Sequence, residues 1–361
     1  MRDVSVTRRD FVESMMAALA ATLSIGKEGN AQSSEASKPF IDVHHHFLPP
    51  AWMSAYNISR PGPFDNSALT NWTPSRSVEE MDRQSVQTAI VSLSTPNVWA
   101  GDPAIAPRLA RITNEYAAKM VVDHPGRFGF FASVPITDSA AAIAELNHAL
   151  DQLHADGIVL LTSQEGRYLG HPMFDGVLSA LNERGAVVYV HPATPACCRN
   201  VIEDIPPSVV EFAFETTRAI VNLLMSGALS RYSKLRFIFS HGGGTLPFLA
   251  GRITGSAPVM EAERQNRLQG GAELLLKALF FDTMTMENAA SMSALLHTVT
   301  SRHLMFGSDY PHAAGNRRSS SASGAIKSLA SSGVLNSADL AAIQSRTAAG
   351  LLPRWSKGVP R

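Results

Sequence analysis

The segment IDVHHHFLPP at positions 41–50 ends an apolar run with three consecutive histidines. Side chains two residues apart on a β-strand point to the same face, so His44 and His46 can direct two imidazoles into one site. His45 then faces the opposite side, into the surrounding packing. Imidazole is a common ligand of transition metals. The spacing therefore predicts that His44 and His46 bind a metal ion and that His45 does not.

Three further residues that could bind a metal or move a proton end other apolar runs. His191 follows AVVYV, His241 follows LRFIFS, and Asp309 lies in LMFGSDYPH. A single histidine at a strand end is more often a hydrogen-bonded structural residue, but such residues at the ends of four strands are far less expected by chance. Imidazoles with one carboxylate suit Zn²⁺, with Mn²⁺, Fe²⁺ or Co²⁺ as alternatives, and leave one coordination position open.

The elements that must position these residues form a regular pattern. Apolar runs rich in β-branched or aromatic residues alternate with helical patterns, which is typical of βα units around a parallel sheet. The expected strands are 40–46, 88–94, 128–135, 156–163, 186–193, 235–243, 279–284 and 304–312. These eight units within residues 40–355 predict one α/β domain, a (β/α)8 TIM barrel, with the candidate residues at the C-terminal ends of the strands, where barrels carry their active sites.

Two segments lie outside the repeating units. Residues 50–75 form the longest irregular connection, an insertion after strand 1 that could serve as a lid or pocket wall, and residues 319–355 are expected to close the barrel with helices. A doubly wound open sheet is the alternative fold. The sequence HGGG at 241–244 argues against it, because it lacks the G-x-G-x-x-G spacing of a dinucleotide-binding turn.

Composition excludes some functions. The chain has 361 residues, with 31 Lys and Arg against 31 Asp and Glu, so no net charge favours binding to nucleic acid or anionic lipid. Its two cysteines, Cys197 and Cys198, are adjacent and define no disulfide framework. We expect them to be pocket-lining or buried thiols in the loop after His191.

The N-terminal residues form a separate segment. A twin-arginine pattern, VTRRDF at 6–11, precedes a short apolar stretch, so residues 1–31 are predicted to be a Tat-type export signal, with 32–39 as a linker. An N-terminal amphipathic helix is the alternative interpretation. The apolar stretch is too short for a membrane span of about 20 residues, so no membrane anchor is expected. A functional signal would place the protein in the periplasm; otherwise it is cytoplasmic.

The motifs also resemble those of a known family. IDVHHHFLP, VHP, SHGGGTLPFLAGRI and MFGSDYPH occur in the order found in the amidohydrolase superfamily, and resemble its metal-dependent decarboxylase branch. The longer segments 160–192 and 216–232 look most like the 6-methylsalicylate decarboxylases; the aminocarboxymuconate semialdehyde decarboxylases are the second similar group. The resemblance covers about residues 40–315.

The resemblance implies roles for individual residues. His44, His46, His191 and Asp309 correspond to the metal ligands and His241 to the acid/base histidine beside the metal. Arg252 corresponds to an arginine that enters the neighbouring subunit's site, which implies a homodimer; an ordinary surface arginine is the alternative.

These roles favour a metal-dependent, non-oxidative decarboxylase of a small aromatic or unsaturated carboxylic acid, with a salicylate-type acid as the expected substrate. Asp309 or His241 would protonate the carbon that loses CO₂. A metal-dependent hydrolase of a lactone, ester or amide is the alternative, although the expected strand 4, DGIVLLTS, offers no lysine for carboxylation. A third possibility is an exported metal-binding protein without turnover.

The substrate pocket is the least defined part of the site. Trp72, Phe281 and His312 are the candidate pocket residues, although aromatic residues at strand or helix edges are more often part of a core.

Overall fold

The computed structural model describes residues 39–56, 67–99, 102–198, 201–313 and 322–356. The predicted export signal and almost all of the linker lie outside the described residues. Among the residues that are described, no helix is long and apolar enough to cross a membrane.

Eight parallel strands form one sheet, in the order β1-β2-β3-β4-β7-β8-β9-β10. Their bounds are β1 Phe40–His46, β2 Val86–Ser92, β3 Phe128–Ser133, β4 Gly157–Leu161, β7 Val187–His191, β8 Arg236–Phe239, β9 Phe280–Asp282 and β10 Leu304–Met305. Backbone hydrogen bonds between β1 and the segment that directly follows β10 close the ring: Val43 N–H donates to the Phe306 carbonyl at 3.0 Å and His46 N–H to the Tyr310 carbonyl at 2.7 Å. The predicted (β/α)8 barrel is confirmed.

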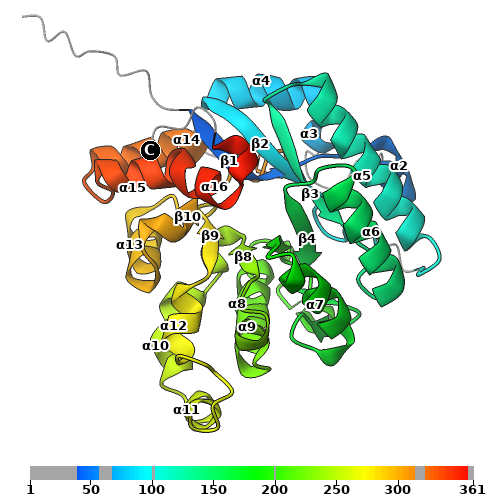
Figure 1. The fold of residues 1–361 in the computed structure, drawn as a ribbon. Coiled ribbons are helices and arrows are strands. Elements are labelled where there is room, and N and C mark those ends of the chain that lie inside the picture. Colours follow the sequence, from blue (N-terminus) through cyan, green and yellow to red (C-terminus); the bar gives the residue numbers. More distant parts are fainter. Residues whose placement is uncertain (1–38, 57–66, 100–101, 199–200, 314–321, 357–361) are drawn as a thin grey trace, which may run out of the picture. The chain divides into compact units, whose positions relative to one another are not determined.

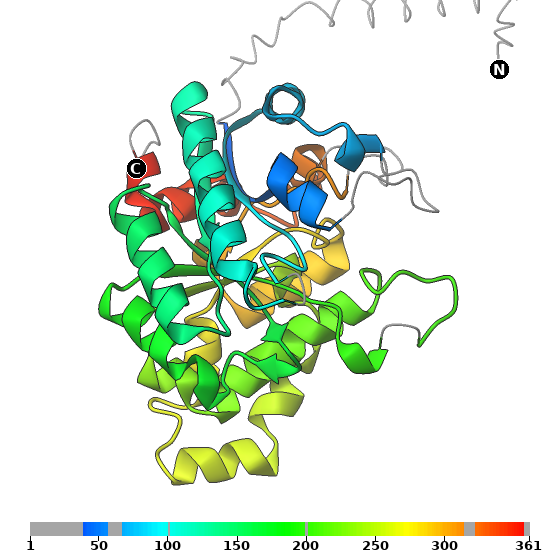
Figure 2. The ribbon, with the colours of Figure 1, turned by 90° about the vertical axis from the view of Figure 1, so that its right-hand side faces the viewer.

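Helices surround the ring of strands, and the chain passes once around it (Figures 1 and 2). The helices are α2 Pro50–Ala55, α3 Ser67–Thr70, α4 Pro74–Gln84, α5 Ala106–Asp123, α6 Ser139–Asp151, α7 Asp175–Glu183, α8 Glu211–Met225, α9 Ala228–Arg231, α10 Leu246–Thr254, α11 Ala257–Arg264, α12 Ala272–Lys277, α13 Ala289–Thr298, α14 Ala322–Ser331, α15 Ser337–Ala341 and α16 Thr347–Leu351. The predicted insertion after β1 is therefore partly helical, since α2 and α3 lie within residues 50–75.

Two hydrophobic clusters hold the barrel together. The inner cluster fills the barrel with side chains such as Val43, Phe131 and Tyr189, and Ala348 and Leu352 at the end of the chain join it. The larger outer cluster packs the strands against the helices. The C-terminal part of the chain thus closes the barrel, as predicted. It does so at the end where the strands begin, which leaves the C-terminal ends of the strands for the functional site.

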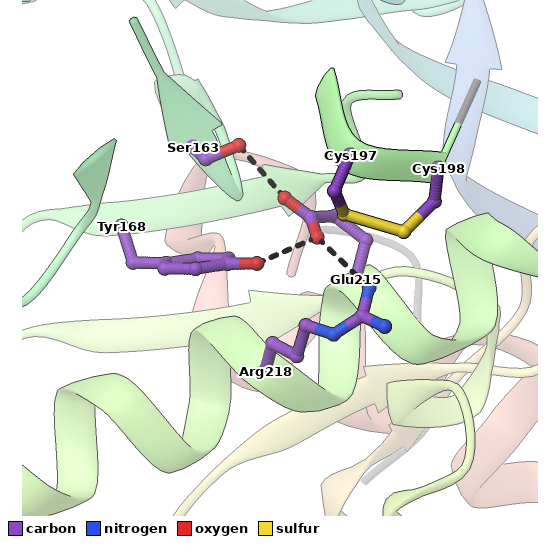
Figure 3. The surroundings of a disulfide bond; sticks show 6 residues. All are labelled: Ser163, Tyr168, Cys197, Cys198, Glu215 and Arg218. Carbon is purple, nitrogen blue, oxygen red and sulfur yellow. Dashed lines mark hydrogen bonds and ion pairs between the residues drawn. A yellow bond between two sulfur atoms is a disulfide. The ribbon is translucent and has the colours of Figure 1, made fainter. Parts of the chain in front are cut away.

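A short hairpin, β5 Ser163–Gln164 with β6 Arg167–Tyr168, projects after β4. It is tied to α8 by the buried carboxylate of Glu215, which accepts hydrogen bonds from Ser163 Oγ at 2.7 Å and Tyr168 Oη at 2.9 Å (Figure 3).

The adjacent cysteines lie close to this hairpin. Cys197 and Cys198 form a disulfide with each other, so the prediction of two free thiols is wrong (Figure 3). Cys197 is exposed, and the preceding residue, Ala196, lines the cavity described below.

Candidate metal centre

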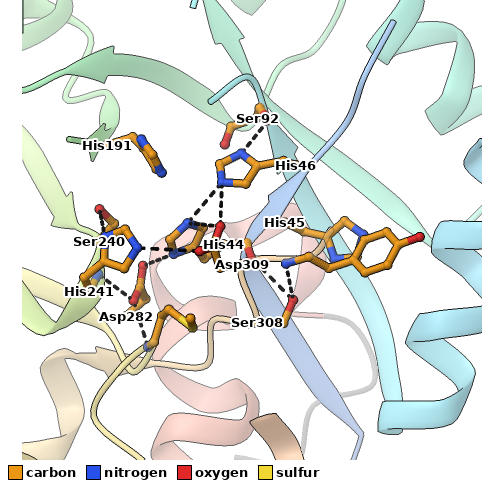
Figure 4. Close-up of polar contacts among 12 residues, drawn as sticks. His44, His45, His46, Ser92, His191, Ser240, His241, Asp282, Ser308 and Asp309 are labelled. Atoms are coloured by element: carbon orange, nitrogen blue, oxygen red, sulfur yellow. Dashed lines mark hydrogen bonds and ion pairs between the residues drawn. The ribbon is translucent and has the colours of Figure 1, made fainter. Parts of the chain in front are cut away.

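Four side chains meet at the C-terminal end of the barrel. His44 and His46 come from β1, His191 from the end of β7, and Asp309 from the segment after β10, and each offers one ligand atom within 4.8 Å of all the others. The Nε2 atoms of His44 and His46 lie 3.1 Å apart, and Asp309 Oδ1 lies 3.3 and 3.1 Å from them (Figure 4). Ligand atoms bound to one ion at about 2.0–2.2 Å are themselves roughly 3 Å apart. The spacing therefore fits a single shared cation.

The three histidines are held with their Nε2 atoms turned toward this centre. In each ring Nδ1 lies against an acceptor: His44 against Asp282 Oδ2 at 2.9 Å, His46 against the Ser92 carbonyl at 3.0 Å, and His191 against the Pro192 carbonyl at 3.0 Å. Carbonyl and carboxylate oxygens only accept, so each Nδ1 carries a hydrogen and Nε2 is the nitrogen that can bind a metal, once His44 has released its second proton. This arrangement is typical of metal-binding histidines.

Asp309 completes the fit. Its Oδ1 is buried and lies 3.3 and 3.1 Å from the Nε2 atoms of His44 and His46, but no contact with the described residues has the geometry of a hydrogen bond. A buried carboxylate oxygen without a donor is costly, and a bound cation would satisfy it. Burial would raise the pKa of Asp309, but the charge of His44 and the neighbouring imidazoles hold this pKa well below its usual range. Asp309 is therefore an anionic ligand at neutral pH, and its positive φ of 56° shows that the surrounding structure constrains it.

Metal binding is expected to release one proton from His44. Burial lowers the pKa of His44, but the carboxylates of Asp282 and Asp309 outweigh it and raise this pKa to about 10 in the metal-free protein. Burial lowers the pKa of His46 to about 4 and that of His191 well below its usual range, so both are already neutral. Because a cation must displace the His44 proton below pH 10, the association constant should fall about tenfold for each pH unit of acidification between pH 8 and 6.

Calorimetric titration of Mn²⁺ in buffers with different ionisation enthalpies measures this release. The expected value is about one proton per ion at pH 7. Release of no proton, together with an affinity independent of pH, would contradict this account of His44.

His241 stands beside the four ligands. Its imidazole Nε2 lies 3.7 Å from Asp309 Oδ2, its ring centroid lies 4.9 Å from that of His44, and its side chain is 11% exposed. Its Nδ1 contacts Ser240 Oγ at 3.1 Å. An imidazole that borders the candidate metal ligands and can still reach solvent suits a group that moves protons. The predicted placement of His241 agrees with this geometry.

The glycines after His241 allow its backbone to turn sharply. Gly244 has a φ of +68°, and an added Cβ would collide with the Ala213 carbonyl. We expect Gly244→Ala to lower the free energy of unfolding by about 2–4 kcal/mol, from backbone strain and overpacking. Gly251→Ala is the matched control, because Gly251 lies in helix α10 with open space at its Cβ, and its effect should stay within about 1 kcal/mol. Urea unfolding compares the two; equal losses would contradict the collision.

Two carboxylates that sequence reasoning missed support the site. Asp42 on β1 accepts the backbone N–H groups of His44 at 3.0 Å and Ser308 at 3.1 Å, and so joins the first strand to the segment that carries Asp309. Asp282 at the end of β9 contacts the His44 ring. Each is an isolated acidic residue in a buried strand, which is the signal that could have identified both.

His45 faces away from the centre, as predicted. Its Nδ1 lies 3.1 Å from Asp42 Oδ2 and its Nε2 3.3 Å from Ser77 Oγ. The side chain is 1% exposed, so this buried Ser–His–Asp arrangement stabilises the strand and has no access to a substrate.

Of the three predicted pocket residues, only His312 lies beside the metal centre. His312 lies beside the centre, with its ring centroid 5.0 Å from that of His46. Trp72 is 6% exposed, and its indole N–H donates to Ser77 Oγ at 3.0 Å. The same hydroxyl contacts His45, so Trp72 lies in the packing on the His45 side of β1. Phe281 has no exposed surface and packs against Phe239 in the outer cluster. The structure thus places Phe281 in the core and not in a pocket.

A cavity of about 790 Å³ opens where the connections after β2, β4 and β7 meet. Its lining includes Thr95, Trp99, Gln164 and Thr194, and Thr194 follows the metal-ligand candidate His191 by three residues. Its walls combine an indole ring with small and polar side chains, which suits a small aromatic ligand. Arg252, in contrast, is exposed on α10.

Comparison with known proteins identifies relatives. The sequence profile of the amidohydrolase family matches residues 41–354. A 6-methylsalicylic acid decarboxylase of Aspergillus aculeatus is 38% identical over 279 residues, which cover 76% of this chain and 84% of that protein. The 6-methylsalicylic acid decarboxylase of Penicillium expansum is 36% identical over 280 residues, which cover 76% and 85%.

Solved structures share the architecture. A structure described as an amidohydrolase is 28% identical, with a TM-score of 0.77 over 87% of this chain and 99% of that chain. A dihydroxybenzoic acid decarboxylase of Polaromonas with bound manganese and 2-nitroresorcinol is 21% identical, with a TM-score of 0.73 over 87% and 97%, and at this identity establishes the fold alone. The profile match and the decarboxylase relatives together show that this chain belongs to the amidohydrolase family, in its decarboxylase branch.

Proposed function

We propose that this protein is a metal-dependent, non-oxidative decarboxylase of a small aromatic carboxylic acid of the salicylate type. The observation that carries the proposal is the four-ligand centre of His44, His46, His191 and Asp309 with the imidazole of His241 beside it. The names of the relatives support the substrate class, since two of them act on 6-methylsalicylic acid.

The four ligands would hold one divalent transition metal. This metal would act as a Lewis acid toward the carboxylate and the ortho oxygen of the substrate. We propose Zn²⁺ or Mn²⁺; the manganese in the Polaromonas enzyme supports the second. Elemental analysis of the purified protein distinguishes them. Within the described residues the histidine and carboxylate cluster offers ligands for one ion, which favours a mononuclear site.

The remaining chemistry falls to His241. When the bond between the ring carbon and the carboxylate breaks, CO₂ leaves and the bonding electrons stay on the ring carbon, which then takes a proton. Asp309 is one of the four candidate ligands, so its carboxylate would be engaged with the metal and is less suited to act as an acid. We therefore assign the proton donor to His241, whose Nε2 faces the same space as the ligands.

The test is a CO₂-release assay on metal-loaded protein with salicylate, 6-methylsalicylate, 2,6-dihydroxybenzoate and muconate-type acids. Release of CO₂ and formation of the corresponding phenol from a hydroxybenzoate is the expected result. If no acid is decarboxylated while a lactone, ester or amide is hydrolysed, the hydrolase alternative holds. Metal binding without either reaction would indicate a metal-binding protein without turnover.

We also propose that the protein is a homodimer in which Arg252 approaches the partner's site. Arg252 is exposed on α10, and Phe248 on the same helix is 87% exposed, as expected for a surface that a second subunit covers. Light scattering after size-exclusion chromatography measures the oligomeric state. A monomer with full activity would contradict the proposal.

Export to the periplasm is proposed from residues 1–31 alone. Fractionation of cells that express the full chain, compared with Arg8→Lys/Arg9→Lys, tests it. The wild-type protein should be periplasmic and the variant cytoplasmic. The same distribution of both would contradict export through this signal.

A further inference from the structure

Asp282 is a fully buried carboxylate at the C-terminal end of β9. Both of its oxygens are used. Oδ2 lies 2.9 Å from the ring Nδ1 of His44 and accepts the hydroxyl of Tyr189 at 3.0 Å. Oδ1 accepts the backbone N–H groups of His241 at 2.9 Å and Met284 at 3.0 Å. Such a set of donors offsets the cost of burying the charge.

The first oxygen acts on a metal-ligand candidate. A carboxylate only accepts, so its contact with Nδ1 keeps a hydrogen on that nitrogen and leaves Nε2 of His44 as the nitrogen directed at the centre (Figure 4). Tyr189 steadies the same oxygen from β7, inside the barrel. Asp282 itself does not belong to the group of four that could share an ion.

The second oxygen acts on the proton-donor candidate through its backbone. His241 has a φ of +55°, a conformation that is unfavourable for a residue with a side chain and needs external support. The hydrogen bond from His241 N–H to Asp282 Oδ1 supplies that support at the point where the chain leaves β8. The direction of the imidazole follows from the backbone that carries it.

We propose that Asp282 is a positioning residue that fixes the ring of His44 and the backbone of His241 relative to each other through the two oxygens of one carboxylate. It therefore sets the metal affinity and the rate of proton transfer by separate contacts. The kinetic part rests on the proposed decarboxylase function, whereas the metal-binding part does not.

Asp282→Asn is the diagnostic substitution, because it keeps the shape and replaces one acceptor oxygen with an NH₂ donor. With the amide nitrogen toward His44, two donors face each other and the ring is driven to the tautomer with hydrogen on Nε2, which opposes metal binding. With the nitrogen toward His241, it faces two backbone N–H groups. Either orientation disrupts one of the two contacts.

The readouts are the Mn²⁺ dissociation constant, measured by chelator competition, and kcat at saturating Mn²⁺. We expect Asp282→Asn to weaken Mn²⁺ binding about 10- to 100-fold, to lower kcat at least tenfold at saturating Mn²⁺, or to do both, with KM changed less than kcat. Tyr189→Phe is the matched control: it removes one donor from the same carboxylate and should change the dissociation constant less than about threefold.

A folded Asp282→Asn protein with lower thermal stability but wild-type Mn²⁺ affinity and kcat would reduce Asp282 to a structural residue and overturn the proposal. If the variant does not fold, nitrogen NMR of wild-type protein with Zn²⁺ tests the proposal instead, because it shows which ring nitrogen of His44 carries the hydrogen. His44 should carry its hydrogen on Nδ1, and a hydrogen on Nε2 overturns the proposal. If no acid is decarboxylated, the affinity and NMR readouts still test the metal-binding part.

Discussion

His46→Ala is expected to abolish metal binding and with it the activity. His46 has no exposed surface, and its Nε2 lies 3.1 Å from both the Nε2 of His44 and Oδ1 of Asp309. Without His46, three of the four ligands remain, and the charged side chains of His44 and Asp309 stand in an incomplete site. The metal content of purified protein should fall to about one tenth or less, and kcat/KM should fall at least about 1,000-fold, since the metal supplies several kcal/mol to the transition state.

His45→Asn is the control for that variant. The amide of asparagine can replace the ring Nδ1 as a donor to Asp42, and the side chain faces away from the metal centre. This variant should keep metal content near the wild-type value, as measured by elemental analysis. If His45→Asn loses metal as completely as His46→Ala, the loss reflects damage to β1 and not removal of a ligand.

His241→Asn is expected to separate metal binding from catalysis. Asparagine tolerates the positive φ of 55° better than most residues, so the backbone hydrogen bond to Asp282 should persist. The imidazole is lost, and kcat should fall about 100- to 10,000-fold, which is the usual contribution of a general acid.

Metal content of His241→Asn should stay within about twofold of wild type, because His241 is outside the group of four ligands. Steady-state CO₂ release and elemental analysis on one preparation give both values. Unchanged kcat would move the proton donor to another group, and a parallel loss of metal would make His241 a ligand.

The sequence was most informative where side-chain chemistry and strand periodicity coincide. His44, His46, His191, His241 and Asp309 end apolar runs, and parallel strands of a barrel place such ends together, so their convergence was predictable. The structure also explains where Phe281 lies. Asp282 contacts His44, so its neighbour Phe281 faces the other side of β9, toward the helices.

Other features depend on contacts between distant segments. Asp42 joins β1 to Ser308, 266 residues away, and no local pattern specifies that pairing. The last strand is only Leu304–Met305, because the chain continues beside β1 through isolated backbone bonds instead of a regular ladder. The helix α2 begins with Pro50 at its first turn, a local signal that the irregular composition of 50–75 obscured.

Four side chains from three parts of the barrel, β1, β7 and the segment after β10, are proposed to share one divalent cation. Anomalous diffraction at the manganese edge, from crystals grown with Mn²⁺, tests it directly. We predict one strong peak at about 2.0–2.3 Å from Nε2 of His44, His46 and His191 and from a carboxylate oxygen of Asp309. A fully formed site without a peak, or a peak bound by other residues, would contradict it.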